Sequence, residues 1–207
     1  MGIGKAGAKW AVCAVATALL LGGCAGSDEG VAASEFDTKV APASARWSSE
    51  ATRGIAVPEA DQGPEKVDPV PHGWDESPQG AVLAAINAQT YMATAGEQTW
   101  PEVSRHMLAD GQGRDQWVQA RSLMDIDGQV DNPPVFKGFR FSEFSGEKAV
   151  VVLAADYPSQ GLLGYPVQLD RSSGDWRVVL PVQGEEPDLQ AITDEQFDDF
   201  VRFSPDE

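Results

Sequence analysis

The sequence predicts an α+β domain in which three N-terminal helices pack on a curved, four-stranded antiparallel sheet, preceded by a cleaved signal and a disordered tether. Apolar residues between positions 78 and 124 recur with helical spacing, whereas those between 135 and 182 alternate as in strands. The chain has 207 residues, of which 42% are apolar and 8% aromatic. This length and composition suit one domain with appendages.

The first 23 residues predict an export signal. Lys5 and Lys9 precede a 12-residue apolar run, Trp10 to Leu21. A transmembrane helix needs about 20 apolar residues, so this run is too short to span a bilayer. The following Leu21-Gly22-Gly23-Cys24 resembles the lipobox of bacterial lipoproteins. The resemblance implies that Cys24 carries a diacylglycerol anchor and holds the chain on the extracytoplasmic face of the cytoplasmic membrane; the alternative is an ordinary secretory signal with an incidental cysteine.

Charge and cysteine content exclude several function classes. The chain has 15 Lys and Arg against 32 Asp and Glu, a net charge of -17, which disfavours nucleic-acid binding. Cys13 lies within the signal, so the mature chain has no cysteine pair, no Cys metal site and no Cys nucleophile. His72 and His106 stand at no recognisable metal-ligand spacing, and we therefore expect neither metal nor cofactor.

Residues 24–77 are expected to form a lipid-anchored, disordered tether. They are rich in Ala, Ser, Gly, Pro and acids and show no regular apolar period. The segment Val67 to Trp74 is an exception, because it places two prolines, a glycine and a tryptophan shortly before a helix start. It could dock as an arm that offers Trp74 to a partner, or Trp74 could simply pack beside the helix entry.

Three helices are predicted between residues 78 and 124. Ser77-Pro78 combines an N-cap with proline at the first helical position, and the alanine-rich run after it ends at Gly96. Thr99-Trp100-Pro101-Glu102 matches a capping box at the start of a short second helix. Apolar spacing predicts a third helix from Arg114 to about Met124.

Four strands in two hairpins follow. Val135 to Phe144 and Lys148 to Tyr157 flank a turn at Ser145-Gly146. Leu162 to Asp170 and a strand from Trp176 to Val182 form the second hairpin and complete the domain over residues 78–182.

Residues 183–207 form an acidic C-terminal segment. Phe197, Phe200 and Phe203 recur at three-residue spacing, which favours a docking helix over Ala191 to Phe203. A solvated acidic tail remains the alternative.

The order of three helices and four strands, with a last strand that begins Gly174-Asp175-Trp176-Arg177, resembles the nuclear transport factor 2-like (cystatin-like) superfamily. The resemblance spans Pro78 to Val182 and implies a cone-shaped α+β domain. Its enzymes use a His, Asp or Tyr inside the cone, but His106, Asp156 and Tyr157 make no recognisable catalytic set, so we expect no enzyme. Candidate residues for a ligand pocket in the cone are Val135, Phe139, Phe141, Val151, Tyr165 and Trp176.

Val70 to Ala95 also resembles actinobacterial lipoproteins of unassigned function that accompany integrative or conjugative elements. We therefore expect a protein-binding or assembly module of an envelope-associated conjugation or secretion apparatus, with an unidentified envelope protein as partner. The alternative is a lipoprotein whose cone binds a small apolar ligand, and a cone-centred enzyme is a more distant one. A hollow cone would favour the ligand, and a filled cone with an exposed apolar patch would favour the partner.

Overall fold

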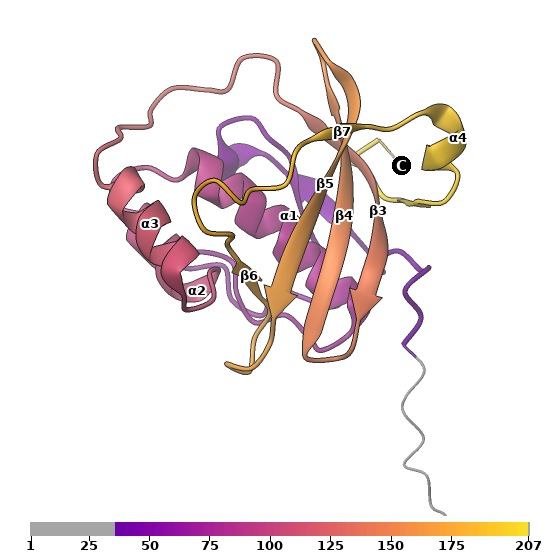
Figure 1. Cartoon of the computed structure of the whole chain (residues 1–207), viewed down its shortest axis with the longest axis horizontal. Helices are drawn as coiled ribbons and strands as arrows, with labels where there is room; N and C mark the ends of the chain where they lie inside the picture. Colours follow the sequence, from indigo (N-terminus) through magenta and orange to yellow (C-terminus); the bar gives the residue numbers. More distant parts are fainter. Residues whose placement is uncertain (1–35, 207) are drawn as a thin grey trace, which may run out of the picture. The chain divides into compact units, whose positions relative to one another are not determined.

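The computed structural model describes residues 36–206, so the predicted signal and Cys24 lie outside the described residues. A six-stranded antiparallel sheet has the order β6-β5-β4-β3-β8, and β7 pairs with β5. Figure 1 shows α1 crossing behind β4 and β5, with α2 and α3 beyond the β6 edge. The sheet therefore has an inner face, on which α1 packs, and an outer face.

Four strands of the sheet follow the predicted hairpins, although the last is shorter than the predicted strand from Trp176 to Val182. The strands β3 (Val135–Phe144), β4 (Lys148–Tyr157) and β5 (Gly161–Asp170) have ten residues each, whereas β6 (Arg177–Val179) has three. Alternate residues of β4 face inward and are buried, since Ala149, Val151 and Leu153 are 0 to 4% exposed. The two-residue period thus places one side of each strand in the core.

Helix α1 (Pro78–Thr94) is confirmed as predicted. The Ser77 hydroxyl accepts a hydrogen bond from the Gly80 amide at 3.1 Å, which caps the helix. The helix is buried over most of its surface, and even the polar Asn87 is only 1% exposed. The buried amide of Asn87 is satisfied, because its Nδ2 donates to the carbonyl oxygens of Pro58 and Leu83 at 2.9 Å. This helix forms the centre of the core.

The helices α2 (Trp100–His106) and α3 (Gln112–Arg121) follow. The predicted capping box at Thr99 is wrong, because its side chain makes no capping hydrogen bond. The Arg121 guanidinium is 2% exposed and donates to the carbonyl oxygens of Ala95 and Met124 at 2.5 and 2.6 Å, which joins the end of α3 to the end of α1.

The predicted disordered tether is wrong for residues 36–77. This part contains β1 (Arg46–Ser48), the 3-10 helix η1 (Glu50–Thr52) and β2 (Val57–Glu59), and β1 and β2 form a two-stranded sheet. Val70 and Trp74 are 0 and 4% exposed within the core. A few buried side chains, far apart in the sequence, and backbone hydrogen bonds hold this segment in place. Buried side chains so far apart produce no regular apolar period in the sequence.

The C-terminal segment is neither a solvated tail nor the single helix considered over Ala191 to Phe203. It forms β7 (Gln190–Ala191), α4 (Asp194–Phe197) and β8 (Val201–Arg202) across the outer face. Gly138 and Gly164 allow this close approach, since a Cβ at these positions would lie 2.5 Å from the Val201 carbonyl and 3.0 Å from Ile192.

The predicted fold, three helices on a four-stranded sheet, is therefore wrong as an architecture. The described residues form an α+β structure with four α-helices, one six-stranded antiparallel sheet and a separate two-stranded sheet. Strands β1 and β2 precede the helices, and β7, α4 and β8 follow the predicted domain. Both additions consist of very short elements, which carry too few residues to show a period.

Candidate functional site

An apolar cavity of about 300 Å³ lies between α1 and the inner face of the sheet. The strands supply most of its wall, with Phe136, Leu153, Ala155, Tyr157, Leu163 and Tyr165. Gln89, Thr90 and Ala93 of α1 line the opposite side, and Ile55, Pro134 and Leu189 come from connecting segments. The first of these segments belongs to the part of the chain that was expected to be disordered.

Strand register shows which rows of the inner face border the cavity. Ala155 pairs with Phe136 on one side and with Leu163 on the other, so the smallest side chain stands in the middle of this row. Two rows along the same face, Val151 pairs with Phe141 and Val167, and Val151 and Val167 are 0 and 1% exposed. The inner face is therefore filled in the row of Val151, whereas the rows of Leu153 and Ala155 border the cavity.

The cavity wall carries no charge. None of the residues that line it is an Asp, Glu, Lys, Arg or His. Burial raises the pKa of the Tyr157 and Tyr165 hydroxyls, and the charge of Glu186 raises the pKa of Tyr165 further. Both hydroxyls therefore stay protonated at neutral pH and serve as neutral hydrogen-bonding groups.

One buried polar atom of the wall is unsatisfied. Thr90 is 3% exposed, and its hydroxyl oxygen has no hydrogen-bond partner among the described residues. One turn further along the same helix, the Thr94 hydroxyl donates to the Thr90 carbonyl oxygen at 2.8 Å. Buried hydroxyls are normally paired in this way, so the Thr90 side chain is an exception at the cavity wall.

The mouth of the cavity lies where exposed residues reach its rim. Ala93 on α1 is exposed, and Leu189, just before β7, is 47% exposed. Both belong to the lining. A small molecule could therefore enter between the end of α1 and the C-terminal segment.

Only one of the six predicted pocket residues lines the cavity. Tyr165 lines the cavity. Phe139, Val151 and Trp176 are 0 to 1% exposed in the filled part of the core. Phe141 packs edge-on against Phe139 and Phe144, with ring centroids 5.9 and 5.4 Å apart, and Val135 is paired with Asp156 outside the cavity.

Trp74, the predicted partner-binding residue, is buried. Its amide and that of Gly73 donate to the Asp175 carboxylate at 2.9 and 2.7 Å. The Trp176 indole Nε1 donates to the Asp75 carbonyl at 2.9 Å, which adds a second connection between the arm and the β5–β6 turn. The structure thus corresponds to the alternative in which Trp74 packs beside the helix entry, and a partner has no access to its ring.

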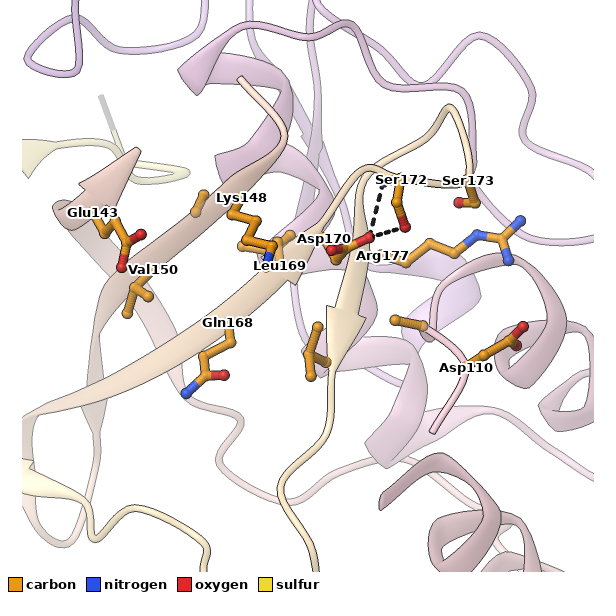
Figure 2. Close-up of a pocket in the computed structure, with 13 residues that line it drawn as sticks. Asp110, Glu143, Lys148, Val150, Gln168, Leu169, Asp170, Ser172, Ser173 and Arg177 are labelled. Atoms are coloured by element: carbon orange, nitrogen blue, oxygen red, sulfur yellow. Dashed lines mark hydrogen bonds between the residues drawn. The ribbon is translucent and has the colours of Figure 1, made fainter. Parts of the chain in front are cut away.

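A second depression, of about 530 Å³, lies on the outer face and is polar (Figure 2). Lys148, Asp170 and Arg177 form a row across β4, β5 and β6. The pKa of Asp170 lies below its ordinary value, mainly because the Ser172 hydroxyl and amide donate to this carboxylate and also because Lys148 is nearby. Asp110, at the rim, forms an ion pair with Arg114. Since both signs of charge alternate here, the surface selects no single ligand charge.

The two histidines meet although 34 positions separate His72 from His106. Their rings are stacked with centroids 4.4 Å apart, and His106 Nε2 lies 3.5 Å from a Glu102 carboxylate oxygen. Burial, then the neighbouring His72, lowers the pKa of His106. The pair joins the arm to α2.

The candidate catalytic residues lie apart from one another. Among residues 36–206, no group of three or more His, Cys, Asp or Glu side chains could hold a metal ion. Asp156 is exposed on the face opposite to Tyr157, and His106 lies outside the cavity lining, so the three cone candidates do not converge.

Sequence reasoning missed Thr90, Ala155 and the loop residues of the wall. The strand β4 contains Ala149 and Ala154 as well as Ala155, so the sequence did not single out Ala155, and Ile55 and Leu189 gave no signal either. Within residues 36–206, no helix has the length and apolar character needed to cross a membrane.

Comparisons with known proteins give a family without an assigned activity. No curated protein sequence and no solved structure matches the chain. A family model described as a domain of unknown function, DUF8175, matches residues 23–200. This match covers most of the 207 residues, and the chain belongs to this family.

Proposed function

We propose that this protein is a lipoprotein, anchored through Cys24 on the extracytoplasmic face of the membrane, that binds a small, mainly apolar ligand in the cavity between α1 and the sheet. The cavity carries the proposal. Ligand sites are concave, mostly apolar and about 300 to 1,000 Å³ in volume, with a few polar groups that fix orientation. The cavity described above, at about 300 Å³, lies at the lower limit of this range.

The volume indicates the size of the ligand. A water molecule occupies about 30 Å³ in the liquid, so the cavity corresponds to about ten waters and suits a ligand of about ten heavy atoms. The gain on binding comes from removing apolar surface from water, at roughly 25 cal/mol per Å². Larger molecules would need to displace Leu189, which stands at the mouth.

The ligand is favoured over the protein partner that the sequence suggested. Trp74 was the candidate contact for such a partner, and this residue is 4% exposed. Leu189, in contrast, is one of the exposed large apolar side chains of the described residues, and it belongs to the cavity.

Binding can be tested with the mature chain that starts at residue 24 and carries Cys24→Ala. This substitution removes the lipid, so that no detergent is needed and apolar probes cannot partition into micelles. Propylbenzene and 2-octanone have about the size that the cavity accepts. We expect both to raise the melting temperature, because a ligand that binds only the folded state stabilises it by mass action.

Filling variants show whether the probes occupy the cavity. Ala155→Leu places a larger side chain in the cavity wall, and Ala93→Leu narrows the mouth from an exposed helical position that tolerates leucine. Ala120→Leu is the matched control, because Ala120 is an exposed alanine of α3 outside the lining. Loss of binding in the first two variants but not in the third supports the proposal; equal binding in all three, or no binding to the parent, contradicts it.

A further inference from the structure

We infer that the ligand is an uncharged molecule with one carbonyl or hydroxyl oxygen, which forms a hydrogen bond with the Thr90 hydroxyl. This inference rests on the proposed function, because it names the class of molecule that the same cavity takes. It depends on two separate features of the wall, the unsatisfied Thr90 hydroxyl and the lack of charged side chains.

Thr90 provides the recognition group. A buried hydroxyl without a partner is unfavourable in the free protein, because the solvation that it loses on folding is not replaced. The helix itself could have offered a remedy, as it does for Thr94, whose hydroxyl donates to the carbonyl oxygen four residues earlier at 2.8 Å. The Thr90 hydroxyl instead has no partner among the described residues, and Thr90 is one of the residues that line the cavity.

The neutral wall excludes ions. A carboxylate or ammonium group in the cavity would lose its water and find no side chain of opposite charge among the lining residues. Glu186 also acts on Tyr165 at the wall, so its negative charge would repel an anion that approaches there. A neutral alcohol or ketone meets both conditions.

Three probes of similar size distinguish these features: propylbenzene has no hydrogen-bonding oxygen, 2-octanone has one, and octanoate carries a charge. In the parent chain we expect 2-octanone to bind about fivefold more tightly relative to its affinity for Thr90→Val, since one hydrogen bond contributes roughly this factor. Propylbenzene should bind the parent and Thr90→Val equally. Octanoate should bind at least tenfold more weakly than 2-octanone.

Two further variants complete the test. Thr90→Ser keeps the hydroxyl and should retain the preference for 2-octanone. Thr94→Val removes a hydroxyl that is satisfied within the helix, so it should lower the melting temperature while both affinities stay at parental values. Thr90→Val should not lower the melting temperature of the free protein, because it removes an unpaired group and replaces it with an isosteric apolar one.

The outcomes separate the inference from the proposed function. If Thr90→Val weakens both uncharged probes equally, or weakens neither, the Thr90 hydroxyl does not recognise the ligand, although the cavity still binds apolar molecules. Octanoate that binds as tightly as 2-octanone would overturn the neutral-ligand inference. Failure of the parent to bind any probe would instead contradict the proposed function itself.

Discussion

Replacing Asp175 with alanine should release the arm (residues 67–74) from the sheet. The Asp175 carboxylate accepts hydrogen bonds from the amides of Gly73, Trp74 and Trp176 at 2.7, 2.9 and 2.9 Å. The first two cross from the β5–β6 turn to the arm. In Asp175→Ala both arm amides lose their acceptor while they remain partly buried.

The expected loss follows from these two bonds. A hydrogen bond to a charged group contributes about 1.5 to 3 kcal/mol, and the lower end applies here because Asp175 is half-buried and water can replace part of the interaction. Asp175→Ala should therefore lower the free energy of unfolding by about 3 kcal/mol, a large part of the 5 to 15 kcal/mol that is typical of a domain. Asp175→Asn should cost about half as much, because one oxygen remains to accept from Trp74 and Trp176 whereas the amide group faces the Gly73 N–H.

Urea unfolding followed by tryptophan fluorescence measures both values, and hydrogen exchange reports the Gly73 and Trp74 amides directly. Glu76→Gln is the control. Its carboxylate lies 3.7 Å from Arg171 at the same junction, but the side chain is 68% exposed, and such surface pairs contribute at most about 1 kcal/mol. If Asp175→Ala is as stable as Glu76→Gln, or Asp175→Asn is less stable than Asp175→Ala, the carboxylate does not hold the arm.

Three further predictions concern the anchor, the histidine pair and the C-terminal segment. Cys24→Ala should move the protein from the membrane fraction to the soluble fraction of fractionated cells; a variant that is still cleaved and equally membrane-bound would refute lipidation. The pKa of His106 lies below its ordinary value of 6.5, so as pH falls below 6.5 the unfolded chain binds the proton first and the free energy of unfolding decreases. Urea unfolding above and below this pH should therefore show a smaller decrease for His106→Gln than for the parent, and equal decreases would exclude His106 as the cause. Gly138→Ala should cost about 2 kcal/mol and expose β8 to protease, because its Cβ would lie 2.5 Å from the rigid Val201 carbonyl. Gly164→Ala should cost less, since its nearest contact is the flexible end of Ile192 at 3.0 Å, and the reverse order would contradict this account.

Elements that depend on local signals were predictable from the sequence. The start of α1 is encoded by Ser77-Pro78, and the β3–β4 hairpin by alternating residues around Ser145-Gly146. The arm was not predictable, because Trp74 becomes ordered through Asp175, a distant position that no local pattern connects with it. The C-terminal phenylalanines suggested a helix, but Phe203 is buried beyond β8 while Phe197 belongs to α4, so their spacing reflects separate contacts.

The candidate site was predictable only as a sheet face. Alternation identifies which side chains point inward, and Tyr165 was found in this way. Alternation does not show how far α1 stands from each row, so it predicts Phe139 and Val151 as pocket residues although they fill the core. Ala155 and Thr90 become informative only when the register and the helix contacts are known, because one matters through its small size and the other through a missing hydrogen bond.

The connection between the arm and the β5–β6 turn also constrains the order in which the molecule folds. Gly73 and Trp74 are 102 and 101 residues away from their acceptor in the sequence. Contacts of such separation close slowly, because the entropy of a long loop must be lost before they form. During synthesis the arm has no acceptor until Asp175 has been added, and Trp74 stays without its final packing partners until then. A part of the core that is synthesised early is therefore among the last to reach its native position.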